Sequence, residues 1–152
     1  MMKSKLIFPA LLIFVIFSCR KDDLSDIDYF AFGTAYGECF GDCATFYMIK
    51  GNYLYPDNIE YYTGSISFKS EPFPDEKFTL AIQLINKFPE YLLDNPDKTF
   101  GCPDCADQGG IHIEISDKGK LKKWHIDTTV ENQPAEIRSY IELLIGTMRQ
   151  LK

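Results

Sequence analysis

The segment 111–128 restricts the fold more than any other part of the chain. Isoleucine occupies every second position at its start, which is the period of a strand with one buried face. A two-residue turn at Lys118-Gly119 would return the chain along itself as a hairpin. The predicted cross-strand pairs are Ile111–Ile126, His112–His125, Ile113–Trp124 and Glu114–Lys123. A shift of one residue would place a lysine opposite Ile113, so we expect this register.

Two other segments have apolar residues at helical spacing. The first helix is predicted after Pro74, because Asp75 and Glu76 suit the positive end of a helix dipole, and it ends by Pro89. The last helix is predicted to begin at Pro134. The apolar positions are Phe78, Ile82 and Ile85 in the first helix, and Ile137, Ile141, Leu144, Met148 and Leu151 in the last.

Runs of aromatic and β-branched residues predict further strands. These are Tyr29–Tyr36, Thr45–Ile49, Tyr53–Tyr55 and Tyr61–Phe68. The segment Asp94–Gly110 contains prolines, glycines and cysteines, and we expect it to be a loop. The economical arrangement of these elements is an α+β fold, in which an antiparallel sheet of about five strands has two helices packed on one face.

Residues 1–18 have the pattern of a secretory signal peptide. Lys3 and Lys5 precede the apolar run Leu6–Phe17, which is too short to span a hydrocarbon core that needs about 20 residues. A small residue then stands directly before a cysteine, at Ser18-Cys19. The N-terminus is therefore expected to be an export signal that is removed.

The sequence ending in Ser18-Cys19 resembles the lipobox of bacterial lipoproteins, although Phe17 is bulkier than the residue usual there. The resemblance implies that Cys19 is diacylated, for example with palmitate, and becomes the first mature residue. Its partner would then be membrane lipid. An ordinary signal peptide or an uncleaved anchor is the alternative.

The motif Lys21-Asp22-Asp23 resembles the signal that sends some Gram-negative lipoproteins to the outer face of the outer membrane. This resemblance implies an outer-membrane location, with surface exposure favoured over a periplasm-facing attachment. A polar tether without a sorting role is the alternative. The predicted parts are a signal peptide at 1–18, the lipidated cysteine and tether at 19–26, and one α+β domain at 27–152.

Of the five cysteines, the four after Cys19 form two close pairs, Cys39-x₃-Cys43 and Cys102-x₂-Cys105. In an exported protein such pairs predict structural disulfides, and the sequence does not choose among three connectivities. Four thiolates could instead bind zinc, but an oxidising compartment disfavours that. We therefore expect disulfides of unknown pairing, with these cysteines as the less favoured metal ligands.

The sequence Cys102-Pro103-Asp104-Cys105 also has the Cys-Pro-x-Cys form of thioredoxin-like redox sites. Catalysis there needs a stabilised thiolate, usually at a helix N-terminus. Asp104 and Asp107 are unfavourable neighbours for a thiolate, and Gly109-Gly110 leads into a strand. Thiol-redox chemistry is therefore an alternative to a structural role.

The predicted register sets His112 directly opposite His125. Cross-strand imidazoles can bind zinc or copper. More often such a pair occupies a half-exposed sheet face, so we predict no metal and no other cofactor.

The composition excludes several functions. A net charge of −6 and a pI near 4.9 leave no basic surface for nucleic acid. The sequence has no nucleophile elbow, phosphate loop or dinucleotide fingerprint, and we nominate no catalytic residue. We expect a non-enzymatic protein.

The sequence Cys39-Phe40-Gly41-Asp42-Cys43, followed by an aromatic-rich strand, resembles the start of a domain of unknown function in exported bacterial proteins. Those domains open with Cys-x-Gly-x-Cys and usually continue with proline, where this chain has Ala44. The resemblance implies no established activity. The expected function is a lipid-anchored envelope module that binds or assembles with an unidentified envelope protein or ligand. The alternative is a metal-binding or thiol-redox protein that uses the four cysteines.

Overall fold

The predicted hairpin lies within a mixed β-sheet, and its register is as expected. Strands β5 (Gly110–Asp117) and β6 (Lys120–Asp127) are antiparallel, with Ile113 opposite Trp124 and His112 opposite His125. The two turn residues both have positive φ, 50° at Lys118 and 75° at Gly119. A turn of this kind matches the twist of the flanking strands, so the local sequence fixes the register.

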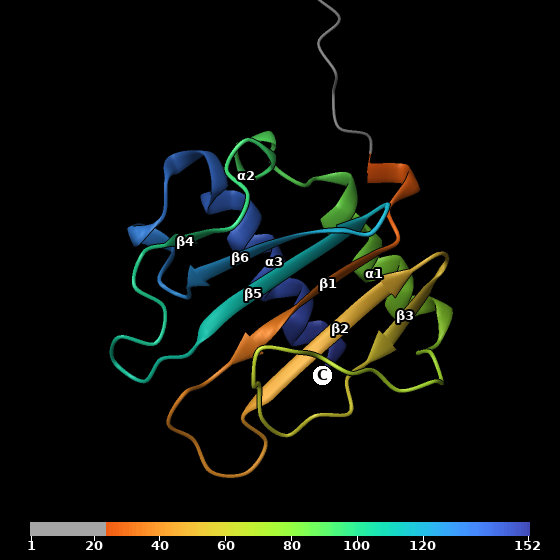
Figure 1. Ribbon diagram of the computed structural model, residues 1–152, viewed down its shortest axis with the longest axis horizontal. Coiled ribbons are helices and arrows are strands. Elements are labelled where there is room, and N and C mark those ends of the chain that lie inside the picture. Colours follow the sequence, from red (N-terminus) through yellow and green to blue (C-terminus); the bar gives the residue numbers. More distant parts are fainter. Residues whose placement is uncertain (1–23) are drawn as a thin grey trace, which may run out of the picture.

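The computed structural model describes residues 24–152, so the predicted signal peptide, Cys19 and the motif Lys21-Asp22-Asp23 lie outside the described residues. The six-stranded sheet has the order β3-β2-β1-β5-β6-β4 (Figure 1). Its remaining strands are β1 (Tyr29–Ala35), β2 (Ala44–Lys50), β3 (Tyr53–Pro56) and β4 (Lys98–Phe100). The prediction of an α+β fold is confirmed.

The prediction of a five-stranded antiparallel sheet is corrected in two respects. Strand β4 runs parallel to β6 inside the segment that was expected to be a loop. Residues 61–68 do not form a strand, and only an isolated bridge pairs Phe68 with Asp57. The aromatic residues of this segment pack across one face of the sheet instead, because Tyr62 and Phe68 contact the small cluster around Phe46.

Helices α1 (Asp75–Asn86), α2 (Glu90–Leu93) and α3 (Ala135–Leu151) pack on the opposite face, which we call the helix face (Figure 1). Each follows a proline, which pre-sets the backbone for a helix start. The short helix α2 was not predicted. Two 3-10 helices, η1 (Leu24–Asp26) and η2 (Val130–Asn132), lie before β1 and α3.

The core lies between the sheet and the helices. All five apolar residues of the predicted α3 stripe are buried, and so are the three isoleucines of β5. Trp124 is buried, and its indole N–H donates to the carbonyl oxygens of Asn95 at 2.9 Å and Leu92 at 3.2 Å. Within residues 24–152, no helix has the length and apolar character needed to cross a membrane.

Gly33 of β1 allows the neighbouring strand β2 to approach closely. A Cβ atom at this position would lie 2.1 Å from the carbonyl oxygen of Thr45 and 2.6 Å from a ring carbon of Phe46. The carbonyl oxygen belongs to the backbone of β2, so it cannot move without moving that strand. Gly146 in α3 is the opposite case, because a Cβ there would meet no atom within 4 Å.

We predict that Gly33→Ala lowers the free energy of unfolding by about 1–3 kcal/mol through overpacking. Gly146→Ala should raise it by about 0.5–1 kcal/mol, because alanine has the higher helix propensity. Urea unfolding followed by Trp124 fluorescence measures both. Equal effects of the two substitutions would contradict the close packing of β1 on β2.

Candidate functional site

Two disulfide-closed loops lie side by side at one end of the sheet. Cys39 is bonded to Cys43 and Cys102 to Cys105, with Cα–Cα distances of 5.6 and 5.5 Å. The Cys39–Cys43 loop follows β1, and the Cys102–Cys105 loop precedes β5. The last residue of β1 pairs with the first residue of β5, so the two loops are neighbours. We call this end the distal end, since the described chain begins at the opposite end of β1 (Figure 1).

The pairing resolves what the sequence left open. Each disulfide is local, so the cysteines neither link the two loops covalently nor form a four-sulfur site. Among residues 24–152 there is no group of three or more histidine, cysteine or acidic side chains placed to hold a metal ion.

The two loops are joined by hydrogen bonds from the Asp104 carboxylate. Its oxygens accept from the backbone N–H of Gly37 in the first loop, at 2.8 Å, and of Gly109 in its own loop, at 3.1 Å. A side chain at Gly37 would collide with this carboxylate, because a Cβ would lie 2.2 Å from Oδ2. Asp104 therefore fixes the position of one loop relative to the other.

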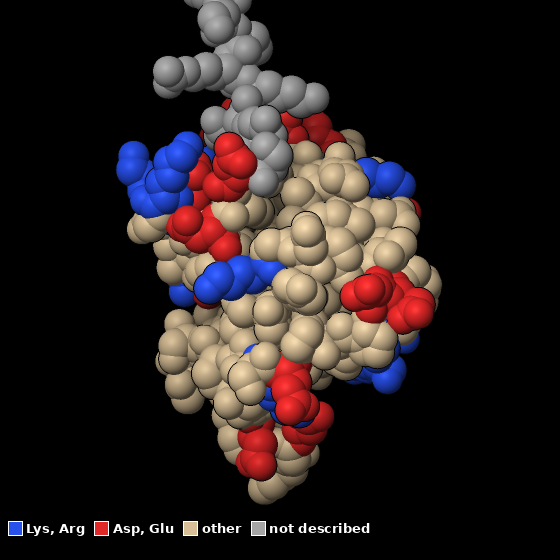
Figure 2. Space-filling model, turned by 90° about the vertical axis from the view of Figure 1, so that its right-hand side faces the viewer, with Lys and Arg blue, Asp and Glu red and all other residues tan. Residues whose placement is uncertain are grey.

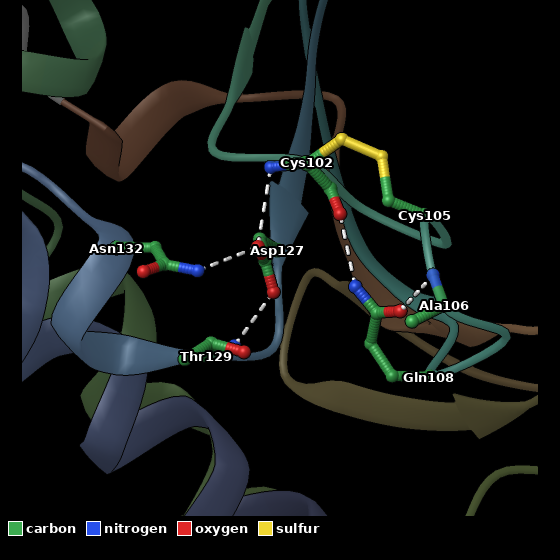
Figure 3. Close-up of a disulfide and its surroundings, with 7 residues drawn as sticks. All are labelled: Cys102, Cys105, Ala106, Gln108, Asp127, Thr129 and Asn132. Carbon is green, nitrogen blue, oxygen red and sulfur yellow. Dashed lines mark hydrogen bonds between the residues drawn. A yellow bond between two sulfur atoms is a disulfide. The ribbon is translucent and has the colours of Figure 1, made fainter.

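A second carboxylate, that of Asp127, holds the Cys102–Cys105 loop to the sheet (Figure 3). It accepts hydrogen bonds from the N–H of Cys102 at 3.1 Å, the N–H of Thr129 at 2.8 Å and the amide of Asn132 at 3.2 Å. Burial alone would raise the pKa of Asp127, but these hydrogen bonds outweigh it and lower the pKa to about 2. The side chain is thus a charged anchor for the distal end.

Gln108 closes the same loop from within (Figure 3). Its amide donates to the Cys102 carbonyl at 2.9 Å, and its side-chain oxygen accepts from the Ala106 N–H at 2.7 Å. The loop is therefore ordered by three hydrogen-bonding side chains in addition to its disulfide.

Exposed aromatic side chains occupy the distal end. Phe40, inside the Cys39–Cys43 loop, is fully exposed, and Tyr36 and Tyr61 are exposed by 42% and 52%. Tyr61 is placed here because the Cys43 N–H donates to the carbonyl of its neighbour Glu60 at 3.0 Å. We call residues 36–43, 60–61 and 101–109 together the distal tip.

A row of side chains crosses the outer face of the sheet, away from the helices, next to the distal tip. Its members are successive cross-strand partners: Phe46, Gly33, His112, His125 and Thr99. The two imidazole rings stack, with centroids 4.1 Å apart and planes inclined by 20°. The predicted opposition of the histidines is therefore confirmed.

Tyr62 packs against Phe46 and His112, the two cross-strand partners of Gly33. Its ring centroid lies 5.2 Å from that of Phe46 and 4.6 Å from that of His112. The rings of Tyr62, His112 and His125 border an open pocket of about 380 Å³. The pocket is also lined by an ion pair, in which the Lys123 ammonium lies 2.7 Å from the buried Glu114 carboxylate.

The stacked histidines are placed for packing rather than for one metal ion. The nitrogen lone pairs of imidazole lie in the ring plane, so two nearly parallel rings cannot both direct a lone pair at an ion between them. Burial, the neighbouring His125 and the Lys123 ammonium lower the pKa of His112 to about 4. Burial also lowers the pKa of His125, although the Asp104 carboxylate opposes the shift.

No family model matches the sequence, and no curated protein matches it significantly. The resemblance of residues 36–43 to an exported domain of unknown function therefore stays a prediction. The structure assigns roles that the sequence interpretation did not predict, namely Asp104 as a bridge between the two loops and Asp127 as an anchor of one of them. Tyr62 was predicted to lie on a strand, and it packs across the sheet instead. The exposure of Phe40 was not predicted, although Phe40 is the one apolar residue between Cys39 and Cys43.

We predict that acid destabilises the folded protein through the stacked histidines. An unfolded histidine titrates near 6.5, whereas His112 in the folded state titrates near 4, so unfolding takes up a proton as the pH falls through this range. The free energy of unfolding should decrease between about pH 6.5 and 4, by at most about 1.4 kcal/mol per pH unit for each histidine. His112→Asn should flatten this slope in urea unfolding, and an unchanged slope would contradict the assignment.

Protonation of Asp127 should also lower the free energy of unfolding, but at lower pH than protonation of the histidines. Its pKa is lowered from 3.8 to about 2, so the stability that it contributes is complete above pH 3.8 and is lost as the pH falls toward 2. Asp127→Asn should cost roughly 1.5–3 kcal/mol at pH 7, the value of hydrogen bonds to a charged group. The matched control Asp117→Asn, at the half-exposed last position of β5, should change the free energy of unfolding little.

Proposed function

We propose that the chain is a lipid-anchored protein of the bacterial cell envelope that acts as a non-enzymatic binding or assembly module, stabilised by disulfides. The single observation that carries the binding role is the exposure of Phe40 in a disulfide-closed loop. An aromatic ring left fully in water gains about 1.5–3 kcal/mol when a partner buries it.

The position of the tip supports this role. The first described residue, Leu24, lies at the end of β1 opposite to the distal tip (Figure 1). A lipid on Cys19, a few residues earlier in the chain, would hold that opposite end near the membrane. The distal tip would then face away from the lipid and toward a partner.

The order of the tip also supports binding. Two disulfides and the hydrogen bonds of Asp104 and Gln108 hold the loops before any partner arrives. Loops that are already ordered lose less conformational entropy on association, which favours tighter binding.

Within this proposal the protein sits on the outer membrane, and surface exposure is favoured over attachment that faces the periplasm. The motif Lys21-Asp22-Asp23, which resembles a surface-export signal, supports this location. The partner is an envelope protein or ligand.

A thiol-redox function is the second candidate, because Cys102 and Cys105 are both exposed. Its support is weaker than that of the binding role. Asp104 and Asp107 place negative charge in the loop, which disfavours a thiolate, and the loop leads into β5 instead of a helix.

We predict that the mature protein, purified from an oxidising bacterial envelope, has a mass that corresponds to cleavage before Cys19, acylation of Cys19 and the loss of four hydrogens in two disulfides. Cys19→Ala should move the protein out of the membrane fraction, because a single acyl chain or none gives only marginal anchoring. Cys39→Ser with Cys43→Ser is the control that should leave the lipid in place.

Retention of Cys19→Ala in the membrane fraction would contradict the lipid anchor. Four free thiols with bound zinc or copper in native mass spectrometry would contradict the disulfide-stabilised binding module and would support a metal-binding function.

A further inference from the structure

We infer that the distal tip binds a protein surface that is rich in lysine and arginine and has an apolar socket for Phe40. The inference rests on the proposed function and names the chemistry of its partner. Its starting point is the exposed aromatic patch of Tyr36, Phe40 and Tyr61, three rings that lie on adjoining loops.

The loops that carry the three rings are hydrogen-bonded to each other. The Tyr36 N–H donates to the Cys43 carbonyl at 3.0 Å, and the Cys43 N–H donates to the Glu60 carbonyl at 3.0 Å. The Asp104 carboxylate attaches the Cys102–Cys105 loop to the same unit through Gly37. The three rings are therefore carried by one hydrogen-bonded unit.

The charges around the rings have one sign. The three segments of the distal tip contain five carboxylates and neither lysine nor arginine. The acidic residues are Glu38, Asp42, Glu60, Asp104 and Asp107. At the opposite end of the sheet, the β5–β6 turn includes Lys118 and is followed by Lys120. In Figure 2 the lowest part of the molecule, farthest from the grey segment, is tan and red.

This combination selects one kind of partner. A guanidinium or ammonium group can lie over an aromatic ring and pair with a carboxylate beside it. A second copy of the same tip would set carboxylates against carboxylates, and anionic lipid would be repelled for the same reason. Complementary charge on a partner protein also raises the rate of association over that of an uncharged surface.

The ring of Phe40 would be the anchor of the interface and the carboxylates its rim. Aromatic anchors near the centre of an interface contribute about 2 kcal/mol or more, which is about a 30-fold change in affinity. Each rim carboxylate contributes a factor of about 1.5–5, and salt screens this contribution.

The test is photo-cross-linking in the cells that express the full chain. Phe40→p-benzoylphenylalanine keeps an aromatic ring at the tip and reacts with whatever contacts it. Tyr53→p-benzoylphenylalanine is the matched control, because Tyr53 is 52% exposed and starts β3 at the opposite end of the sheet. We expect a discrete protein adduct at position 40 that is absent at position 53, with its cross-linked peptide next to lysine or arginine.

Charge is tested in the same cells. Glu38→Gln, Asp42→Asn and Glu60→Gln together should reduce the adduct at least about threefold. The matched control, Glu90→Gln, Glu136→Gln and Glu142→Gln, removes the same net charge from the helices and should leave the adduct unchanged. With the captured protein purified, the affinity should fall as salt rises from about 0.05 M to about 0.5 M.

The outcomes distinguish the inference of a basic partner from the proposal of a binding module. An adduct at position 40 that does not respond to the tip substitutions or to salt overturns the basic partner and leaves the binding module in place. No adduct at position 40 above that at position 53, with the protein still in the membrane fraction, overturns the binding module itself.

Discussion

The pairing of β1 with β5 is the constraint on which the rest of the structure depends. It places a strand from the start of the chain beside one from its last third, in antiparallel register from Tyr29 opposite Ser116 to Ala35 opposite Gly110. Strand β1 ends and strand β5 begins at the same end of the sheet. The loop that follows β1 and the loop that precedes β5 must therefore be neighbours. The two disulfides, the aromatic rings and the row of stacked side chains all lie close together for this one topological reason.

Much of the fold could be predicted because the decisive signals are local. The alternation in 111–128 fixes the hairpin and its register, and the helical stripe of α3 identifies the buried side of that helix. The parallel strand β4 could not be predicted, since only three residues form it and two of them are exposed. The segment 61–68 was mistaken for a strand because aromatic residues that pack across a sheet resemble those that pack within one.

Only part of the candidate site could be predicted from the sequence, because the contacts that build the rest join distant parts of the chain. The cysteine spacing indicates structural disulfides. The bridge that Asp104 makes between two loops depends instead on a contact between residues 67 positions apart. Asp127 likewise looks like any surface carboxylate until its three donors are in place. Hydrogen bonds between distant loops leave no periodicity in the chain, so structure is needed to find them.

The short span of each disulfide separates the tip from the stability of the domain. A bridge across three or four positions restricts the unfolded chain by about 2 kcal/mol, against about 4 kcal/mol for one joining the two cysteine pairs. Each bridge therefore stabilises the domain less than one long cross-link would. Phe40 is fully exposed inside its loop, so it can be exchanged for other residues at little cost to folding, and the same scaffold can present different recognition residues.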